Sequence, residues 1–333
     1  MVVRRLAISG LGSIGRQHLA ACSRLPGVRV DLFDPDPELL NRAESPLVDR
    51  RTTSFDDLLS GAPDAVVLAG PDHTHVPQLL AAVETGATVL VEKPVAESAA
   101  AAREALDRIA DPGQVLVGYV LRHRPVVRRL SALIADGAIG QPTTAQVLLG
   151  AYHTITVAAS RFARPESGRL YRDYSHEWDY LRLLFGPVVG VSALARTTDA
   201  VEHVEQPNLV DALLRHRPDG ATEVVSHCHI DYVDTVGART LQVMGTAGSL
   251  FADLAAGQIR LRRTSGVVEE AHPVTAADGL LAQLRHLMDL VERRTSGLAP
   301  VVGFADGVAA LEVADALRTS AETGQWTAVG AGG

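Results

Sequence analysis

Short apolar runs alternate with longer amphipathic segments along the first third of the chain. The runs are rich in Val, Leu and Ala, a composition typical of parallel strands that are covered on both faces. They occupy residues 6–9, 28–33, 64–70, 88–92 and 114–120. The segments 74–86 and 97–113 between them are predicted to be helices, since one ends at a glycine and the other at Pro112 and Gly113. This alternation predicts an α/β fold with a doubly wound parallel sheet, whose ligands bind beyond the carboxyl ends of the strands.

The second half of the chain shows a different pattern, in which apolar and polar residues alternate between glycine and proline breaks. This period of two predicts strands within residues 143–153, 208–217, 222–232 and 238–245. Helical periodicity predicts an amphipathic helix that begins near Pro125, and further helices over residues 274–297 and 306–323. We therefore expect two domains, residues 1–121 and 122–333, with the C-terminal helix able to return toward the first domain.

Composition and charge narrow the classes of function. Of the 333 residues, 47% are hydrophobic and 21% are charged, which is the balance of a folded globular protein. The net charge of −8 disfavours nucleic acid and an anionic membrane surface, so a small molecule is the expected partner. Cys22 and Cys228 lack CxxC spacing, which argues against a disulfide framework and fits a reducing cytoplasm. The first residues contain no apolar run long enough for a signal or membrane segment.

A glycine motif directly follows the first predicted strand. Gly10, Gly12 and Gly15 fit GxGxxG, with Ser13 and Ile14 between the last two glycines. In a dinucleotide-binding turn the first glycine allows the tight turn, the second lets a pyrophosphate approach the backbone, and the third allows close packing of helix on strand. The phosphates would lie at the positive N-terminus of the following helix. Because a strand precedes the motif and a helix follows it, we expect these five residues to bind a dinucleotide.

The second predicted strand ends at Asp34, which indicates the kind of dinucleotide. A carboxylate at this distance from the glycines accepts hydrogen bonds from the adenosine ribose hydroxyls. It would also repel a ribose phosphate, and Pro35 and Asp36 supply no arginine to receive one. We therefore expect NAD rather than NADP. The alternative is that Asp34 only forms the turn before Pro35.

Several longer segments resemble the Gfo/Idh/MocA oxidoreductases, a family named for glucose-fructose oxidoreductase and inositol dehydrogenase. They are GPDHTHVPQLLAAVETGATVLVEKPVA at 70–96, GYVLRHRPVVRRLSALIADGAIGQP at 118–142, YRDYSHEWDYLRLLFG at 171–186 and VADALRTSAETGQW at 313–326. The third is similar to the family's active-site helix. The resemblance implies an N-terminal Rossmann domain and an α+β C-terminal domain whose helices back an open, mainly antiparallel sheet. It also implies that NAD or NADP lies between the two.

The resemblance assigns roles to residues at the strand ends. Lys93 of the EKP motif would reach the reacting hydroxyl of the substrate, and Arg122 would border the active site. The residues that it places around the cofactor are Pro71, Asp72, His75, Glu92, Lys93 and Pro94.

Oxidation of a secondary alcohol by NAD leaves the protein to manage the hydroxyl proton. His176 is the expected acid/base, because histidine exchanges a proton near neutral pH, whereas lysine stays charged unless its surroundings depress its pKa. Lys93 would bind the substrate oxygen, either as an ammonium that stabilises alkoxide character or as a member of the proton relay. The pattern of HEWDYLRLLFGP predicts that His176 lies near the start of a helix that stops at Gly186.

The residues around His176 depart from the family pattern. The resemblance implies an aspartate four residues before this histidine, where Arg172 stands, and Asp173 is three residues before it. Asp173 is therefore either a catalytic and substrate-binding residue or a helix N-cap or turn residue. Asp179 lies three residues after His176, on the same helical face, and is a candidate to orient the imidazole and bind substrate.

Two polar clusters have simpler explanations than a new site. In HCHID the strand period places His227 and His229 on one face and Cys228 on the other, and no further ligands have matching spacing, so we expect no metal site. The basic segment RHRPVVRR at 122–129 lacks interleaved aromatic residues and is better explained by the helix that begins near Pro125.

The leading hypothesis is an NAD-dependent dehydrogenase that acts on a secondary alcohol of a sugar, polyol, aminosugar or nucleotide sugar. One alternative, known in the same fold, is a glycoside hydrolase that recycles its bound NAD internally. The other is a non-catalytic NAD-binding regulator. The resemblance further implies a homodimer or homotetramer formed through the C-terminal sheet.

Overall fold

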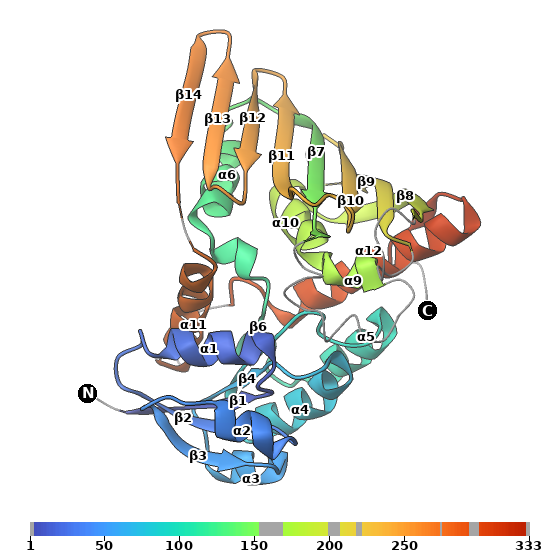
Figure 1. Cartoon of the computed structure of the whole chain (residues 1–333). Coiled ribbons are helices and arrows are strands. Elements are labelled where there is room, and N and C mark those ends of the chain that lie inside the picture. Colours follow the sequence, from blue (N-terminus) through green and yellow to red (C-terminus); the bar gives the residue numbers. More distant parts are fainter. Residues whose placement is uncertain are drawn as a thin grey trace. The chain divides into compact units, whose positions relative to one another are not determined.

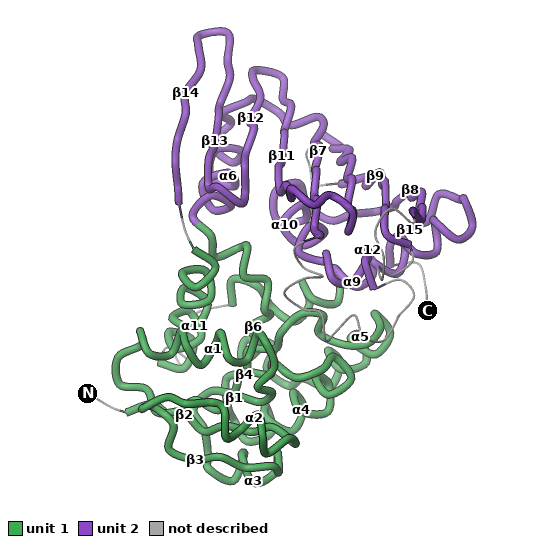
Figure 2. Tube along the Cα trace, in the orientation of Figure 1, with its two compact units in different colours: residues 1–124, 275–309 green, residues 125–274, 310–333 purple. Residues whose placement is uncertain are grey.

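The computed structural model describes residues 3–152, 169–198, 207–217, 222–273, 275–292 and 300–330. Contacts between residues divide the chain into two compact units, drawn in different colours in Figure 2. Unit 1 comprises residues 1–124 and 275–309, and unit 2 comprises residues 125–274 and 310–333. Unit 1 contains all of the first expected domain and, in addition, residues 275–309. Residues 153, 274 and 293–297 of the predicted elements lie outside the described part of the chain.

Unit 1 is built on a six-stranded parallel sheet with the order β3-β2-β1-β4-β5-β6 (Figure 1). The strands are β1 (Arg4–Ser9), β2 (Val28–Phe33), β3 (Val48–Thr52), β4 (Ala65–Leu68), β5 (Thr88–Val91) and β6 (Val115–Val117). Every residue of β4, β5 and β6 is buried. This is the expected result for apolar strands covered on both faces, and it confirms the predicted doubly wound sheet.

Helices cover both faces of this sheet. They are α1 (Ser13–Cys22), α2 (Pro37–Arg42), α3 (Phe55–Ser60), α4 (Asp72–Glu84), α5 (Ala99–Arg108) and α11 (Ala276–Glu292), with short 3₁₀ turns η1 (Pro112–Gln114) and η2 (Val120–His123). Right-handed crossovers place α1 and α4 on opposite faces. Helix α11 packs against α1, β4 and β5, because its leucine stripe is buried on them. That burial explains why residues 275–309 belong to unit 1.

Unit 2 contains a nine-stranded mixed sheet with the order β14-β13-β12-β11-β7-β10-β9-β8-β15. Its strands are β7 (Pro142–Gly150), β8 (Val188–Arg196), β9 (Leu209–His216), β10 (Val224–Asp231), β11 (Ala238–Gly245), β12 (Gly248–Asp253), β13 (Gln258–Arg263), β14 (Gly266–Ala271) and β15 (Thr327–Ala328). Only β7 and β10 pair in parallel, so the open and mainly antiparallel sheet is confirmed. Its helices are α6 (Pro125–Ala135), α9 (Arg169–Asp173) and α10 (Ser175–Phe185), and α12 (Phe304–Thr323) passes from unit 1 into unit 2 at Ala310.

The two faces of this sheet differ in exposure. On one face alternate residues such as Cys228, Ile230 and Leu241 are fully buried. The register places His229 on the other face, beside Asp211 of β9 and Leu148 of β7. We call the face that carries His229 the open face. No helix among the described residues is long and apolar enough to cross a membrane.

Candidate functional site

The glycine motif forms a tight turn between β1 and α1. Gly10 has φ +89°, and a Cβ there would lie 2.6 Å from the backbone nitrogen of Gly70. A Cβ on Gly15 would overlap the carbonyl oxygen of Gly10, so the third glycine lets the helix pack against the turn. At Gly12, by contrast, an added Cβ would meet no atom within 4 Å. The turn is therefore closed by Gly10 and Gly15 and open at Gly12, and this geometry fits a pyrophosphate that approaches the backbone.

Asp34 is fixed at the end of β2 by two backbone amides. One carboxylate oxygen accepts a hydrogen bond of 2.7 Å from the Leu11 N–H, and the other accepts one of 2.9 Å from the Asp36 N–H. The first bond joins the acidic strand end to the glycine turn. The second bond closes the turn at Pro35, and Asp36 then caps α2 by accepting the N–H of Glu38.

The segment Glu92-Lys93-Pro94 follows β5 directly, with a cis peptide bond between Lys93 and Pro94. His75 of α4 is buried beside it, and its two ring nitrogens lie 2.8 Å from the carbonyl oxygen of Pro94 and 3.0 Å from that of Gly70. Burial lowers the pKa of His75 below its usual value, against the effect of these two acceptors. A neutral imidazole carries one N–H, so the ring donates to one of these two carbonyls, either on the loop after β4 or on the loop after β5. Pro71 and Asp72 begin α4 at the same edge of the sheet.

Arg122 makes structural contacts within unit 1. Its guanidinium donates to the Asp306 carboxylate at 3.1 Å and to the carbonyl oxygen of Val301 at 3.3 Å. The side chain is buried, so this ion pair ties the turn η2 to the start of α12. A substrate contact of Arg122 stays a prediction.

Helix α10 carries His176 as its second residue, as predicted, and ends at Gly186, which has φ +82°. Its N-cap residue is Tyr174, whereas Asp173 is the last residue of α9. The helix-cap explanation of Asp173 is therefore wrong. The buried carboxylate of Asp173 instead accepts a hydrogen bond of 3.1 Å from the hydroxyl of Tyr232, just beyond β10.

The inner face of α10 is fully buried. Asp179 is completely inaccessible, while His176 is only half-buried. Glu177 forms a bidentate ion pair with Arg239 of β11, with distances of 2.8 and 2.9 Å. This buried pair fixes α10 to the sheet.

The far end of α10 is held by a buried histidine. One ring nitrogen of His216 lies 3.1 Å from the carbonyl oxygen of Gly186, and the other lies 2.9 Å from the hydroxyl of Ser226. Burial lowers the pKa of His216 to about 4, and nearby Arg182 acts in the same direction. The imidazole is therefore neutral in the folded protein at neutral pH.

Acid is expected to destabilise unit 2 through His216. The unfolded chain binds the proton near pH 6.5, so the free energy of unfolding falls as the pH drops from about 6.5 toward about 4. The expected loss is up to about 3 kcal/mol. Thermal denaturation between pH 7 and pH 4 measures it, with His216→Gln as the non-titrating control. An equal pH dependence in the two proteins would show that His216 contributes nothing.

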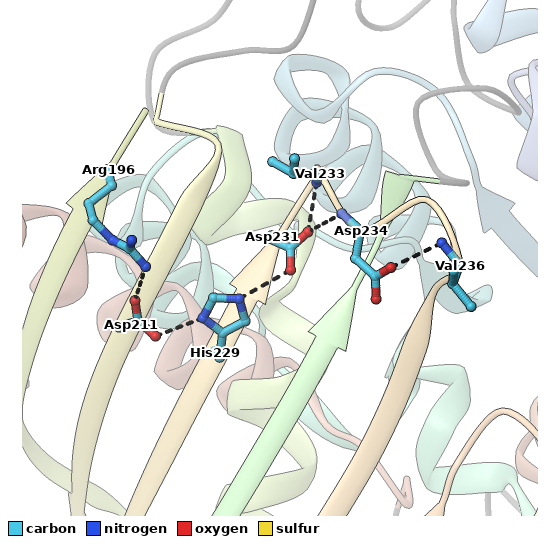
Figure 3. Close-up of polar contacts among 7 residues, drawn as sticks. All are labelled: Arg196, Asp211, His229, Asp231, Val233, Asp234 and Val236. Carbon is cyan, nitrogen blue, oxygen red and sulfur yellow. Dashed lines mark hydrogen bonds and ion pairs between the residues drawn. The ribbon is translucent and has the colours of Figure 1, made fainter. Parts of the chain in front are cut away.

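On the open face, His229 lies between two carboxylates (Figure 3). Its ring nitrogens are 2.7 Å from Asp211 and 3.1 Å from Asp231, and Arg196 donates to Asp211 at 2.7 Å. Burial acts to raise the pKa of Asp211, but the hydrogen bonds from His229 and Arg196 outweigh it and lower this pKa. Asp231 also accepts the N–H groups of Val233 and Asp234.

This chain of contacts explains the HCHID motif as a structural cluster that fixes the turn after β10. No group of three or more His, Cys, Asp or Glu side chains within the described ranges is placed to hold a metal ion.

The predicted site residues fall into two groups. Unit 1 brings Arg122 and twelve other predicted residues to the carboxyl edge of its sheet or to the turns beside it. The twelve are Gly10, Gly12, Ser13, Ile14, Gly15, Asp34, Pro71, Asp72, His75, Glu92, Lys93 and Pro94. Unit 2 holds Asp173, His176 and Asp179 on α9 and α10. Sequence reasoning missed His18 and Tyr232, which contact Glu92 and Asp173. The alternation of β10 places Tyr232 on the buried face of the sheet, and this alternation in the sequence could have indicated that its side chain lies inside unit 2.

The parallel sheet and its glycine turn define a Rossmann-type dinucleotide-binding domain. Residues 4–119 match the model of an oxidoreductase family with an NAD-binding Rossmann fold, and residues 127–251 match the GFO/IDH/MocA C-terminal domain. The chain belongs to the GFO/IDH/MocA family of oxidoreductases. The predicted family, the enzyme class and NAD as the cofactor are thereby confirmed.

Individual proteins of this family are similar over nearly the whole chain. Inositol 2-dehydrogenase of Mycolicibacterium gilvum is 30% identical over 96% of this chain and 91% of its own. An Agrobacterium radiobacter oxidoreductase, solved with NAD⁺, L-tartaric acid and magnesium, has a TM-score of 0.86 at 18% identity, over 98% of this chain and 99% of its own. A myo-inositol dehydrogenase from Corynebacterium glutamicum has a TM-score of 0.78 at 22% identity, over 99% of this chain and 100% of its own. These two structures show the same fold.

Proposed function

We propose that this oxidoreductase oxidises a secondary alcohol of a polyol or sugar, including aminosugars and nucleotide sugars, with Lys93, His176 and Asp173 as catalytic residues. The observation that supports it most is the place of Lys93. It follows the buried strand β5, at the sheet edge where the glycine turn and Asp34 are also found. The similarity to inositol 2-dehydrogenase, named for a polyol substrate, supports the substrate class.

Composition adds a second argument for Lys93. It is the only lysine among the 31 lysine and arginine residues of the chain. An arginine side chain keeps its proton in proteins, whereas a lysine amine can release one when its surroundings depress its pKa. All the other residues of this group are arginines, so the only lysine side chain stands where the proposed chemistry needs an amine that can release a proton.

The residues of each unit would act as follows. The open turn at Gly12 and the N-terminus of α1 bind the pyrophosphate, and Asp34 accepts the adenosine ribose hydroxyls. NAD, when bound, accepts the hydride from the carbinol carbon. Lys93 hydrogen-bonds the substrate oxygen and stabilises its developing negative charge, while His176 takes the hydroxyl proton. Asp173, oriented by Tyr232, binds a substrate hydroxyl or holds the imidazole.

The proposal is tested by NADH formation over a panel of inositols, free sugars, aminosugars and nucleotide sugars, with NADP in a parallel series. We expect turnover with NAD on one substrate class. If no substrate yields NADH although NAD binds, the dehydrogenase proposal fails. Cleavage of a glycoside without net NADH would then support the hydrolase that recycles its cofactor.

We further propose that two copies associate through the open face. Large apolar side chains are exposed on its strands: Leu148, Leu194, Leu213, Val225, Met244 and Phe251 are each at least 36% exposed. Apolar side chains gathered on one sheet face are typical of an interface. A dimeric or tetrameric mass in solution is expected, and a monomer at micromolar concentration would contradict it.

We also propose a cytoplasmic location, since both cysteines are free and buried.

A further inference from the structure

His18 makes a buried contact that the proposed mechanism does not use. It lies on α1, three residues after Gly15, and its side chain is completely inaccessible. Its Nε2 is 2.8 Å from one carboxylate oxygen of Glu92, and Glu92 is also buried. The helix that starts at the glycine turn is thus joined to the segment that carries Lys93.

The hydrogen bonds around this pair define its tautomer. Nδ1 of His18 is buried and has no hydrogen-bond partner among the described residues. An N–H there would be a buried donor without an acceptor, which is costly. Nε2 therefore carries an N–H, and it donates to the carboxylate of Glu92.

Glu92 transmits this contact to Lys93. Its second carboxylate oxygen accepts the backbone N–H of Lys93 at 3.3 Å, so the carboxylate closes a small ring with the next peptide. Gly118 provides the space, since a Cβ there would lie 2.5 Å from that oxygen. On the other side of the segment, Nδ1 of His75 lies 2.8 Å from the carbonyl oxygen of Pro94. The segment that carries Lys93 is thereby contacted from α1 and from α4.

We propose that His18 is a positioning residue for Lys93, acting through the carboxylate of Glu92. The role of Lys93 in turnover rests on the proposed function, but the effect on its peptide does not. Loss of the Nε2 donor frees the Glu92 carboxylate and lets the Lys93 peptide rotate away from the substrate oxygen. A misplacement of about 1 Å at a catalytic group lowers turnover by up to about 100-fold.

The variants His18→Leu and His18→Gln separate this role from packing. Leucine fills the space without a donor, whereas the glutamine amide places an N–H near the position of Nε2. We expect His18→Leu to lower kcat by about 10- to 100-fold with little change in the KM for NAD, and His18→Gln to stay within about 3-fold of wild type. In a Lys93→Ala background, His18→Leu should change the residual kcat by less than about 2-fold, because the group that it positions is gone.

A readout without turnover tests the same claim. Hydrogen exchange of the Lys93 amide, measured by mass spectrometry on a peptide spanning 88–98, should be at least about 10-fold faster in His18→Leu than in wild type and restored in His18→Gln. Unchanged exchange, or an equal loss of kcat with and without Lys93, would overturn the positioning role. If His18→Leu shows the faster exchange but the wild-type protein oxidises no substrate, the positioning role stays intact and the proposed function is refuted instead.

Discussion

Replacing Lys93 with alanine is expected to lower kcat by about two to four decades while NAD still binds. The reason is that the variant loses the group that binds the substrate oxygen as negative charge develops on it, whereas the glycine turn and Asp34 are untouched. Steady-state NADH formation measures kcat, and calorimetric titration with NAD measures the affinity.

A matched control removes one positive charge elsewhere in unit 1. Arg108 is exposed in the last turn of α5, and Arg108→Ala should leave kcat within about 2-fold of wild type. Turnover of Lys93→Ala at the wild-type rate would remove Lys93 from the catalytic residues. Loss of NAD binding in the same variant would instead assign the lysine to cofactor binding.

Alanine at two glycines of the same turn should affect different properties, the stability of the fold at Gly15 and the binding of NAD at Gly12. In Gly15→Ala the new Cβ overlaps the Gly10 carbonyl, so the turn must shift and the free energy of unfolding should fall by about 2 kcal/mol or more. In Gly12→Ala the Cβ enters open space and φ is −62°, which any residue adopts. Its stability without NAD should stay within about 0.5 kcal/mol of wild type.

NAD affinity separates the two positions further. The Cβ of Gly12→Ala occupies the space where the pyrophosphate approaches the backbone, so the Kd for NAD should rise by about 10-fold or more. Thermal denaturation with and without NAD measures both effects, because a bound ligand raises the melting temperature of wild type. If Gly12→Ala binds NAD as tightly as wild type, the dinucleotide does not lie against this turn.

The elements that were predicted from sequence are those with strong local patterns. The runs of β4, β5 and β6 are continuous, apolar and buried. Glycines mark the ends of α4 and α10, whereas α5 ends at Arg108, before the Pro112 that was expected to stop it. The glycine at position 86 has φ +83°, as a helix terminator of that kind requires. The strand period also placed His227 and His229 opposite Cys228.

Weaker patterns escaped prediction for physical reasons. Strand β3, with the sequence VDRRT, is an edge strand with no fully buried residue, so it lacks the apolar signal of its neighbours. Helices α2 and α3 span only six residues each, and they are held by the caps Asp36 and Ser54 more than by an apolar face. The placement of α11 in unit 1 depends on packing between residues far apart in sequence.

The sequence predicted which residues at the strand ends belong to the candidate site. It did not predict the hydrogen bonds that hold those residues in place. The hydrogen bonds from His18 to Glu92 and from Tyr232 to Asp173 join residues 74 and 59 positions apart. Such long-range pairs leave no periodic trace in one sequence. The helix-cap alternative for Asp173 was wrong because α9 and α10 follow each other closely, which places the N-cap at Tyr174.

The most direct test of the central claim follows the hydrogen itself. A substrate found in the panel is deuterated at its carbinol carbon, and the NADH that it yields is analysed by mass spectrometry. The account predicts that the deuterium is transferred to the nicotinamide of NADH and that Lys93→Ala slows this transfer. NADH without deuterium, or no reduction of NAD by any polyol or sugar, would contradict a dehydrogenase built on this site.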